Sequence, residues 1–183
     1  MTHNSNATIR LSRAVFLDRD GVLTRSITRD GRPFAPTTLD KFELLPGVAE
    51  GVARLREAGF RLIVVTNQPD VATGKVRREV VEEMHARLRA WLPLDDIKVC
   101  YHADADGCAC RKPRPGMLLE AAKQWAVDLG ASFMVGDRWR DVSAGKAAGC
   151  RTILLECGYA ERLVDAPDFV VTSFAEAVSI ILH

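Results

Sequence analysis

Short apolar runs alternate along the chain with longer segments whose apolar residues recur about every four positions. The longer segments, typical of amphipathic helices, span 46–59, 76–92, 115–125 and 142–148, with a last one from residue 174. The short runs have the length of buried strands and span 14–17, 62–65, 97–101, 133–135, 152–155 and 169–171. This alternation predicts an α/β fold, a Rossmann-like three-layer sandwich with a mainly parallel sheet.

Two polar segments interrupt this alternation. Residues 21–42 follow the first strand, and the tetrapeptide 30–33, Asp-Gly-Arg-Pro, is typical of a turn, so we expect a long loop or flap here. Residues 103–115 are rich in Asp, Gly, Cys and Pro and predict an irregular functional loop. Neither segment is long enough for a large cap domain. We therefore expect a flexible N-terminal segment over 1–10 and one domain over 11–183.

The charge balance narrows the classes of partner. Lysine and arginine total 25 against 24 acidic residues, a formal net charge of +1 among 183 residues. No global field attracts nucleic acid or a membrane, so we expect a small-molecule substrate rather than either of these partners. We also expect a monomer. The first residues lack a signal-peptide pattern, and no run approaches the roughly 18 apolar residues of a membrane span. The expected location is the cytoplasm.

Acidic residues follow two of the predicted strands. Asp18 and Asp20 end the first strand and Asp137 ends the fourth, and the carboxyl ends of parallel strands meet at one edge of a sheet. Carboxylates brought together in this way repel one another unless a cation compensates, which predicts a Mg²⁺ site formed by Asp18, Asp20 and Asp137. The Asp18-x-Asp20-Gly21 pattern alone fits an ordinary turn equally well.

The cysteines favour a second metal. Cys100, His102, Cys108 and Cys110 lie within eleven residues, a dense spacing of soft ligands. Three thiolates and one imidazole make a closed tetrahedral zinc site, in which the metal is structural. The alternatives are buried free thiols beside an unrelated histidine, and a redox-active Cys-x-Cys.

The order of polar residues after the strands resembles the haloacid dehalogenase-like phosphohydrolases. The family's aspartate pair is matched by Asp18 and Asp20, its hydroxyl residue by Thr66, and its lysine by Lys112. Its acidic pair is matched by Asp137 together with Asp141.

The resemblance implies a mechanism through an aspartyl-phosphate. Asp18 is then the nucleophile, and Asp20 protonates the leaving group and later takes a proton from water. Thr66 and Lys112 hold the phosphate oxygens as charge redistributes. The implied catalytic residues are Asp18, Asp20, Thr66 and Lys112.

The cysteine loop and the residues after it resemble one branch of this family. The branch contains the D-glycero-D-manno-heptose 1,7-bisphosphate 7-phosphatases and the histidinol-phosphate phosphatases. It implies hydrolysis of the C7 phosphate in nucleotide-activated heptose synthesis, with histidinol phosphate as the alternative substrate. The expected substrate-binding residues are Asn67, Gln68, Arg111 and Arg138. A third alternative is a zinc-ordered binding protein without turnover.

Overall fold

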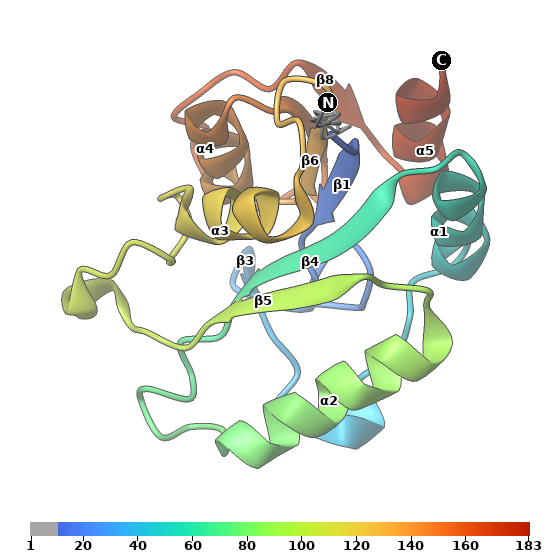
Figure 1. Ribbon diagram of the computed structural model, residues 1–183. Helices are drawn as coiled ribbons and strands as arrows, with labels where there is room; N and C mark the ends of the chain where they lie inside the picture. Colours follow the sequence, from blue (N-terminus) through green and yellow to red (C-terminus); the bar gives the residue numbers. More distant parts are fainter. Residues whose placement is uncertain (1–10) are drawn as a thin grey trace, which may run out of the picture.

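A computed structural model describes residues 11–183, and the flexible segment predicted for 1–10 lies outside the described residues. A six-stranded parallel sheet forms the centre, with strand order β5-β4-β1-β6-β7-β8 (Figure 1). Its strands are β1 (Ala14–Leu17), β4 (Arg61–Asn67), β5 (Asp96–Cys100), β6 (Phe133–Gly136), β7 (Arg151–Leu155) and β8 (Phe169–Val171). The helices are α1 (Val48–Glu57), α2 (Arg78–Trp91), α3 (Gly116–Trp125), α4 (Trp139–Ala148) and α5 (Phe174–Leu182).

The helices cover both faces of the sheet and bury two separate cores. Val15 and Leu17 of β1 pack with residues of α1, α2 and α5, whereas Ala14 and Phe16 face the other side, toward α3 and α4. This is the alternation of a pleated strand that is buried on both faces. The predicted three-layer α/β fold is therefore confirmed.

The sheet reverses its strand order at β1. The chain leaves β1 and returns in β4 on one side, and it later crosses to β6 on the other side of β1. Open parallel sheets bind ligands beyond the carboxyl ends of strands at such a switch point. The residues that follow β1, β4 and β6 are placed around this crevice by topology.

The segment 21–42, expected to be a long loop or flap, contains regular structure. A β-hairpin of β2 (Ile27–Arg29) and β3 (Arg32–Phe34) projects from it, followed by a 3₁₀ turn at Leu39–Lys41. No large cap domain stands over the crevice in residues 11–183. Within the same residues, no helix is long and apolar enough to cross a membrane.

Candidate active site

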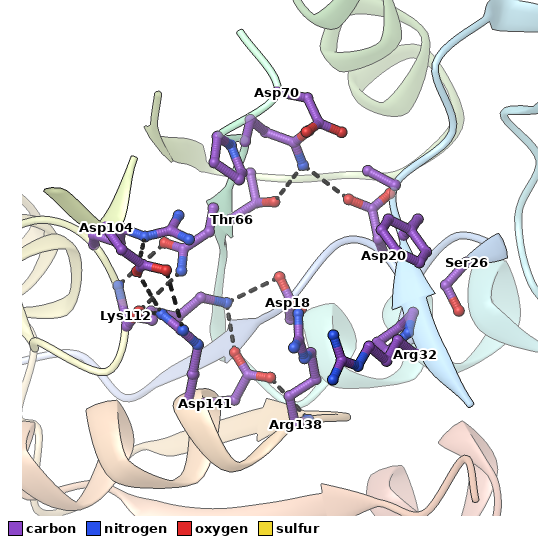
Figure 2. A pocket seen from close by; sticks show the side chains of 18 residues that line it. Asp18, Asp20, Ser26, Arg32, Thr66, Asp70, Asp104, Lys112, Arg138 and Asp141 are labelled. Atoms are coloured by element: carbon purple, nitrogen blue, oxygen red, sulfur yellow. Dashed lines mark hydrogen bonds and ion pairs between the residues drawn. The ribbon is translucent and has the colours of Figure 1, made fainter. Parts of the chain in front are cut away.

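A cavity of about 320 Å³ opens at the carboxyl edge of the sheet. Figure 2 shows its wall, with Asp18 near the centre, Thr66 above it, Lys112 and Asp104 on one side, and Arg32 on the other. The wall includes the residues after β1 and β4, the cysteine loop, the start of α4 and the hairpin. Among residues predicted from the sequence, the cavity is lined by Asp18, Asp20, Thr66, Asn67, Gln68, Arg111, Lys112 and Arg138.

Lys112 joins two buried carboxylates at the floor of the cavity. Its ammonium lies 2.9 Å from Asp18 Oδ1 and 2.5 Å from Asp141 Oδ1, and it also donates to the Val65 carbonyl at 2.7 Å. Burial alone lowers the pKa of Lys112, but the charges of Asp141 and Asp18 outweigh it and raise that pKa. Lys112 is therefore a fixed cation beside Asp18.

Asp18 is a buried carboxylate among other charged groups. Burial raises the pKa of Asp18 to about 6, with Asp141 and Asp20 adding to the shift and Lys112 opposing it. One oxygen of its carboxylate accepts from the Arg19 backbone N–H at 2.8 Å. A carboxylate poised next to a cation and open to a cavity can act as a nucleophile toward phosphorus.

Asp137 carries the one pair of buried, unpartnered oxygens among the described side chains. Neither carboxylate oxygen has a hydrogen-bond partner in residues 11–183. Burial, together with the charges of Asp18 and Asp141, raises the pKa of Asp137 well above its ordinary value. One oxygen from each of these three carboxylates lies within 4.8 Å of the others. Hard oxygen donors gathered in this way fit a divalent cation such as Mg²⁺.

One predicted magnesium ligand, Asp20, adds no side-chain oxygen to the carboxylate cluster, and its part in the ion site stays a prediction. The Asp20 side chain lies outside the carboxylate cluster, because Arg19 and Gln68 hold it elsewhere. Arg19 donates to both Asp20 oxygens at 2.9–3.1 Å, and Gln68 Nε2 donates to Oδ2 at 2.8 Å. Asp141, one turn into α4, occupies the third place in the cluster.

A buried arginine–histidine pair behind Asp20 was not predicted from the sequence. The Arg19 side chain is fully buried, and its Nη1 donates to His85 Nε2 at 3.0 Å. Burial, reinforced by the neighbouring Arg19 charge, lowers the pKa of His85 to about 3, so the imidazole is neutral. The guanidinium also lies 5.3 Å from the Phe42 ring centroid. His85 sits at a core position of α2, and no local pattern marks its partner, which is 66 residues away.

The three residues at the end of β4 have separate contacts. Gln68 Nε2 also donates to Thr66 Oγ1 at 2.9 Å, which links Thr66 to Asp20. The Asn67 side chain makes two hydrogen bonds to the Lys112 backbone. Its Nδ2 donates to the Lys112 carbonyl at 3.0 Å, and its Oδ1 accepts from the Lys112 N–H at 3.1 Å. Asn67 therefore fixes the backbone that carries the Lys112 side chain.

Two arginines predicted to bind substrate have acidic partners in the structure. Arg111 Nε donates to Asp104 Oδ1 at 2.6 Å, and Arg140 shares the same carboxylate at 2.8 Å. Arg138 Nε donates to Glu161 Oε2 at 3.1 Å. Both predicted arginines still line the cavity.

The four predicted zinc ligands gather into one cluster beside the cavity. The Cys110 sulfur lies 3.2 Å from Cys100 Sγ, 3.4 Å from Cys108 Sγ and 3.3 Å from His102 Nδ1. A tetrahedral ion with metal–sulfur bonds of about 2.3 Å has ligand atoms about 3.8 Å apart. The donor set fits a zinc ion, and its atoms need to separate by only roughly half an ångström to surround one.

Comparison with known proteins gives related sequences over most of the chain. A family model described as HAD-hydrolase-like matches residues 109–177. The D-glycero-beta-D-manno-heptose-1,7-bisphosphate 7-phosphatase of Pseudomonas aeruginosa is 38% identical over 158 residues, covering 84% of this chain and 86% of the relative. The enzyme of the same name from Escherichia coli K12 is 35% identical over 182 residues, covering 89% of this chain and 90% of the relative.

A solved structure has a similar fold over nearly its whole length. The D,D-heptose 1,7-bisphosphate phosphatase of B. bronchiseptica, complexed with magnesium and phosphate, superposes with a TM-score of 0.80 at 31% identity. The match covers 93% of this chain and 98% of the other.

Proposed function

Because this chain belongs to the haloacid dehalogenase-like phosphatases, in the branch of D-glycero-D-manno-heptose 1,7-bisphosphate 7-phosphatases, we propose that it hydrolyses the C7 phosphate of that bisphosphate. The enzyme is a phosphoric monoester hydrolase. The arrangement that carries the proposal is a buried carboxylate, Asp18, next to the fixed ammonium of Lys112, with the unpartnered Asp137 beside them.

In the first half-reaction we assign Asp18 as the nucleophile. One of its oxygens forms a bond to phosphorus while the bond from phosphorus to the C7 oxygen breaks, which leaves an aspartyl-phosphate. Asp20 gives its proton to the departing alkoxide. Arg19 and Gln68 fix the orientation of the Asp20 side chain, and the Arg19 ion pair favours the carboxylate that the second half-reaction requires.

In the second half-reaction water attacks the phosphorus of the aspartyl-phosphate. Asp20, now a carboxylate, takes a proton from that water, and the bond between phosphorus and Asp18 oxygen breaks to release inorganic phosphate. Asp18 and Asp20 are thereby returned to their starting states. The same pair of residues serves both halves, so no further acid or base is needed.

Asp18, Asp137 and Asp141 are the residues that we propose hold Mg²⁺. When bound, the ion neutralises repulsion between the nucleophile and the phosphate. Lys112 and Thr66 bind the phosphate oxygens, with Lys112 as a fixed charge beside Asp18.

We assign the remaining predicted contacts according to their position in the cavity. Gln68 supports Asp20 and Thr66, and Asn67 positions Lys112, so these two side chains act mainly through their neighbours. Arg111 and Arg138 bind polar groups of the sugar phosphate, each remaining fixed by its acidic partner.

We propose that zinc occupies the cluster of Cys100, His102, Cys108 and Cys110. The last cysteine is separated from Lys112 only by Arg111. An ion bound at four side chains would fix a loop that has few apolar contacts of its own, and with it the backbone of both cations.

Three predictions from the sequence stay predictions. These are the monomeric state, the cytoplasmic location and a place in nucleotide-activated heptose synthesis. The absence of nucleic-acid and membrane partners is likewise an expectation that rests on the near-neutral net charge.

The first experiment compares kcat/KM for phosphate release with Mg²⁺ across a substrate panel. It contains both anomers of D-glycero-D-manno-heptose 1,7-bisphosphate, histidinol phosphate, fructose 1,6-bisphosphate and simple monophosphates. We expect the highest value for a heptose bisphosphate, and for its beta anomer, which the names of the two relatives specify. A preference for histidinol phosphate would overturn the proposed substrate, and no turnover at all would favour the binding-protein alternative.

An Asp18→Asn variant tests the nucleophile directly. It should fold like the wild type and lose turnover by several orders of magnitude, because the amide oxygen is a far weaker nucleophile. Asp165→Asn is the matched control, since it removes the same charge at a residue that does not line the cavity. Activity of Asp18→Asn within tenfold of the wild type would exclude Asp18 from this role.

A further inference from the structure

Arg32 stands apart from the other cations of the cavity. It lies on β3 of the hairpin and points into the cavity from the side opposite Asp104 and Lys112, as Figure 2 shows. Its place in the sequence indicates only a turn, and Arg32 has no role in the proposed reaction. Its guanidinium is the part of the hairpin that carries a positive charge into the cavity.

The other cations of the wall already have acidic partners. Lys112 contacts Asp18 and Asp141, Arg138 contacts Glu161, and the two remaining arginines share Asp104. Arg32 makes no ion pair with any residue in 11–183. It is therefore the lining cation whose charge no neighbour in these residues neutralises.

The backbone around Arg32 is held in place from two sides. Arg32 pairs across the hairpin with Arg29, and the two residues between them, Asp30 and Gly31, have φ angles of +50° and +70°. This is the combination of a type I′ turn, whose twist matches that of the strands. The backbone N–H of Ala160 donates to the Gly31 carbonyl at 3.0 Å, which attaches the turn to the segment after β7.

A second contact fastens the base of the hairpin. The Ser26 and Tyr159 hydroxyl groups lie 2.8 Å apart and form a hydrogen bond. This bond joins the same two segments as the bond between Ala160 and Gly31. Both ends of the hairpin are thus tied to residues 159–160. The position of Arg32 over the cavity is fixed by these contacts rather than by its own side chain.

From this geometry we propose that Arg32 binds the phosphate that the enzyme does not hydrolyse, the C1 phosphate of the bisphosphate. The inference rests on the proposed function and deepens it. The transferred phosphate belongs at Asp18, where Lys112 already supplies a buried cation. The rest of the substrate extends toward the cavity mouth, where the exposed, unpaired Arg32 offers a planar set of donors that matches a phosphate.

This assignment makes Arg32 a specificity-determining residue. A substrate with a second phosphate gains a charge-assisted contact that a monophosphate lacks, and the Arg32 guanidinium loses little by binding, since it has no partner to give up. Hydrogen bonds to charged groups predict an effect on kcat/KM of about 10- to 100-fold.

The test compares two substrates that differ only in the C1 phosphate. These are D-glycero-D-manno-heptose 1,7-bisphosphate and the matching heptose 7-phosphate, each assayed with wild type and with Arg32→Gln. We expect Arg32→Gln to lower kcat/KM for the bisphosphate about 10- to 100-fold and to leave that for the 7-phosphate unchanged. An Arg32→Lys variant should lie between, because it keeps the charge and loses the planar fork.

Arg29→Gln is the matched control. It removes an arginine from the same hairpin, directly across from Arg32, at a residue that does not line the cavity. We expect Arg29→Gln to leave the ratio of kcat/KM for the bisphosphate to that for the 7-phosphate unchanged. A selective loss as large as that of Arg32→Gln would mean that the charge of the whole hairpin acts at long range, and it would overturn the assignment.

The remaining outcomes separate the two proposals. An equal loss of Arg32→Gln on both substrates would place Arg32 at the transferred phosphate or in hairpin folding, and no loss on either would leave it without a role. Each result overturns the inference while wild-type turnover of the bisphosphate upholds the proposed function. If wild type hydrolyses neither substrate, the proposed function fails and the inference fails with it.

Discussion

Gly21 influences the candidate site through the side chain that it lacks. Its φ is +94°, and a Cβ at this position would lie 1.9 Å from Asp137 Oδ2. The residue after Asp20 must therefore adopt a left-handed conformation and also leave room for a carboxylate from another strand. The glycine of the short Asp-x-Asp-Gly pattern is therefore required partly by Asp137, the residue that follows β6.

At the same scale, His85 predicts a measurable dependence of stability on pH. The pKa of His85 is about 3 in the folded protein and near 6.5 when unfolded. As pH falls below 6.5, the unfolded chain binds a proton at His85 that the folded chain excludes, so stability is lost between about pH 6.5 and 3. The contribution is roughly 1.4 kcal/mol per pH unit within that window.

Urea unfolding of wild type and His85→Gln between pH 4 and 7 measures this contribution. The variant keeps a side-chain acceptor for Arg19 but cannot take up a proton. Its unfolding free energy should therefore fall less steeply as the pH is lowered, and the two slopes should differ by the equivalent of about one bound proton. Parallel curves for the two proteins would show that His85 titrates alike in the folded and unfolded states, contrary to the buried Arg19 contact.

At the scale of elements, the cysteine loop connects β5 to α3 and carries Lys112 to the active site. Cys100 ends β5, and the other three ligands follow within ten residues. Because the loop has no regular structure apart from a 3₁₀ turn at Asp104–Asp106, its shape depends on the proposed zinc site and on side-chain contacts such as Arg111 with Asp104. Loss of one ligand should therefore affect activity at a distance.

Elemental analysis of purified protein tests this dependence. We expect one zinc per wild-type chain, and Cys108→Ala should lower both the zinc content and kcat/KM, since three ligands hold zinc less tightly than four. Cys150→Ala is the control, because Cys150 is buried but is not one of the four clustered donors, and this variant should retain both the zinc content and kcat/KM. Stoichiometric zinc in Cys108→Ala would remove Cys108 from the ligand set.

At the scale of the whole molecule, the carboxylate cluster joins β1, β6 and α4. Asp18 and Asp137 follow the two central strands, and Asp141 lies on the helix. A cation that binds this cluster only in the folded state stabilises the entire domain. At a concentration of Mg²⁺ 100 times its Kd, the gain is about 2.7 kcal/mol, which corresponds to a rise in Tm of roughly 5–10 °C for a chain of this size.

Thermal unfolding with and without Mg²⁺ checks this expectation, and Asp137→Asn provides the contrast. Without the ion, the variant should be more stable than wild type, because a buried carboxylate near two others is replaced by a neutral group. With the ion, the variant should gain much less than the wild type. An equal Mg²⁺-dependent rise in both proteins would exclude Asp137 as a ligand.

The sequence was most informative where chemistry and strand pattern coincide. The apolar runs located the six strands of the sheet to within a few residues. The inner strands are buried on both faces and therefore nearly continuously apolar, whereas the edge strands β5 and β8 are only partly buried. Asp18, Asp20 and Thr66, which follow two of these runs, line one cavity because parallel strands share an edge. Asp137, after another run, lies in the carboxylate cluster with Asp18. The spacing of Cys100, His102, Cys108 and Cys110 likewise predicted a cluster that is local in sequence.

Contacts between distant segments were decided only by the tertiary structure. Local pattern predicted Asp20 among the magnesium ligands, whereas in the structure Arg19 and Gln68 hold its side chain outside the carboxylate cluster, which contains Asp141. The hairpin that aims Arg32 into the cavity is tied down by residues 159–160, more than a hundred positions away. The sequence by itself determined which groups reach the carboxyl edge of the sheet, because the apolar run that forms a strand and the polar residue that ends it are local features of the chain. Which of those groups meet, and which are already neutralised, depends on packing between elements that no local pattern encodes.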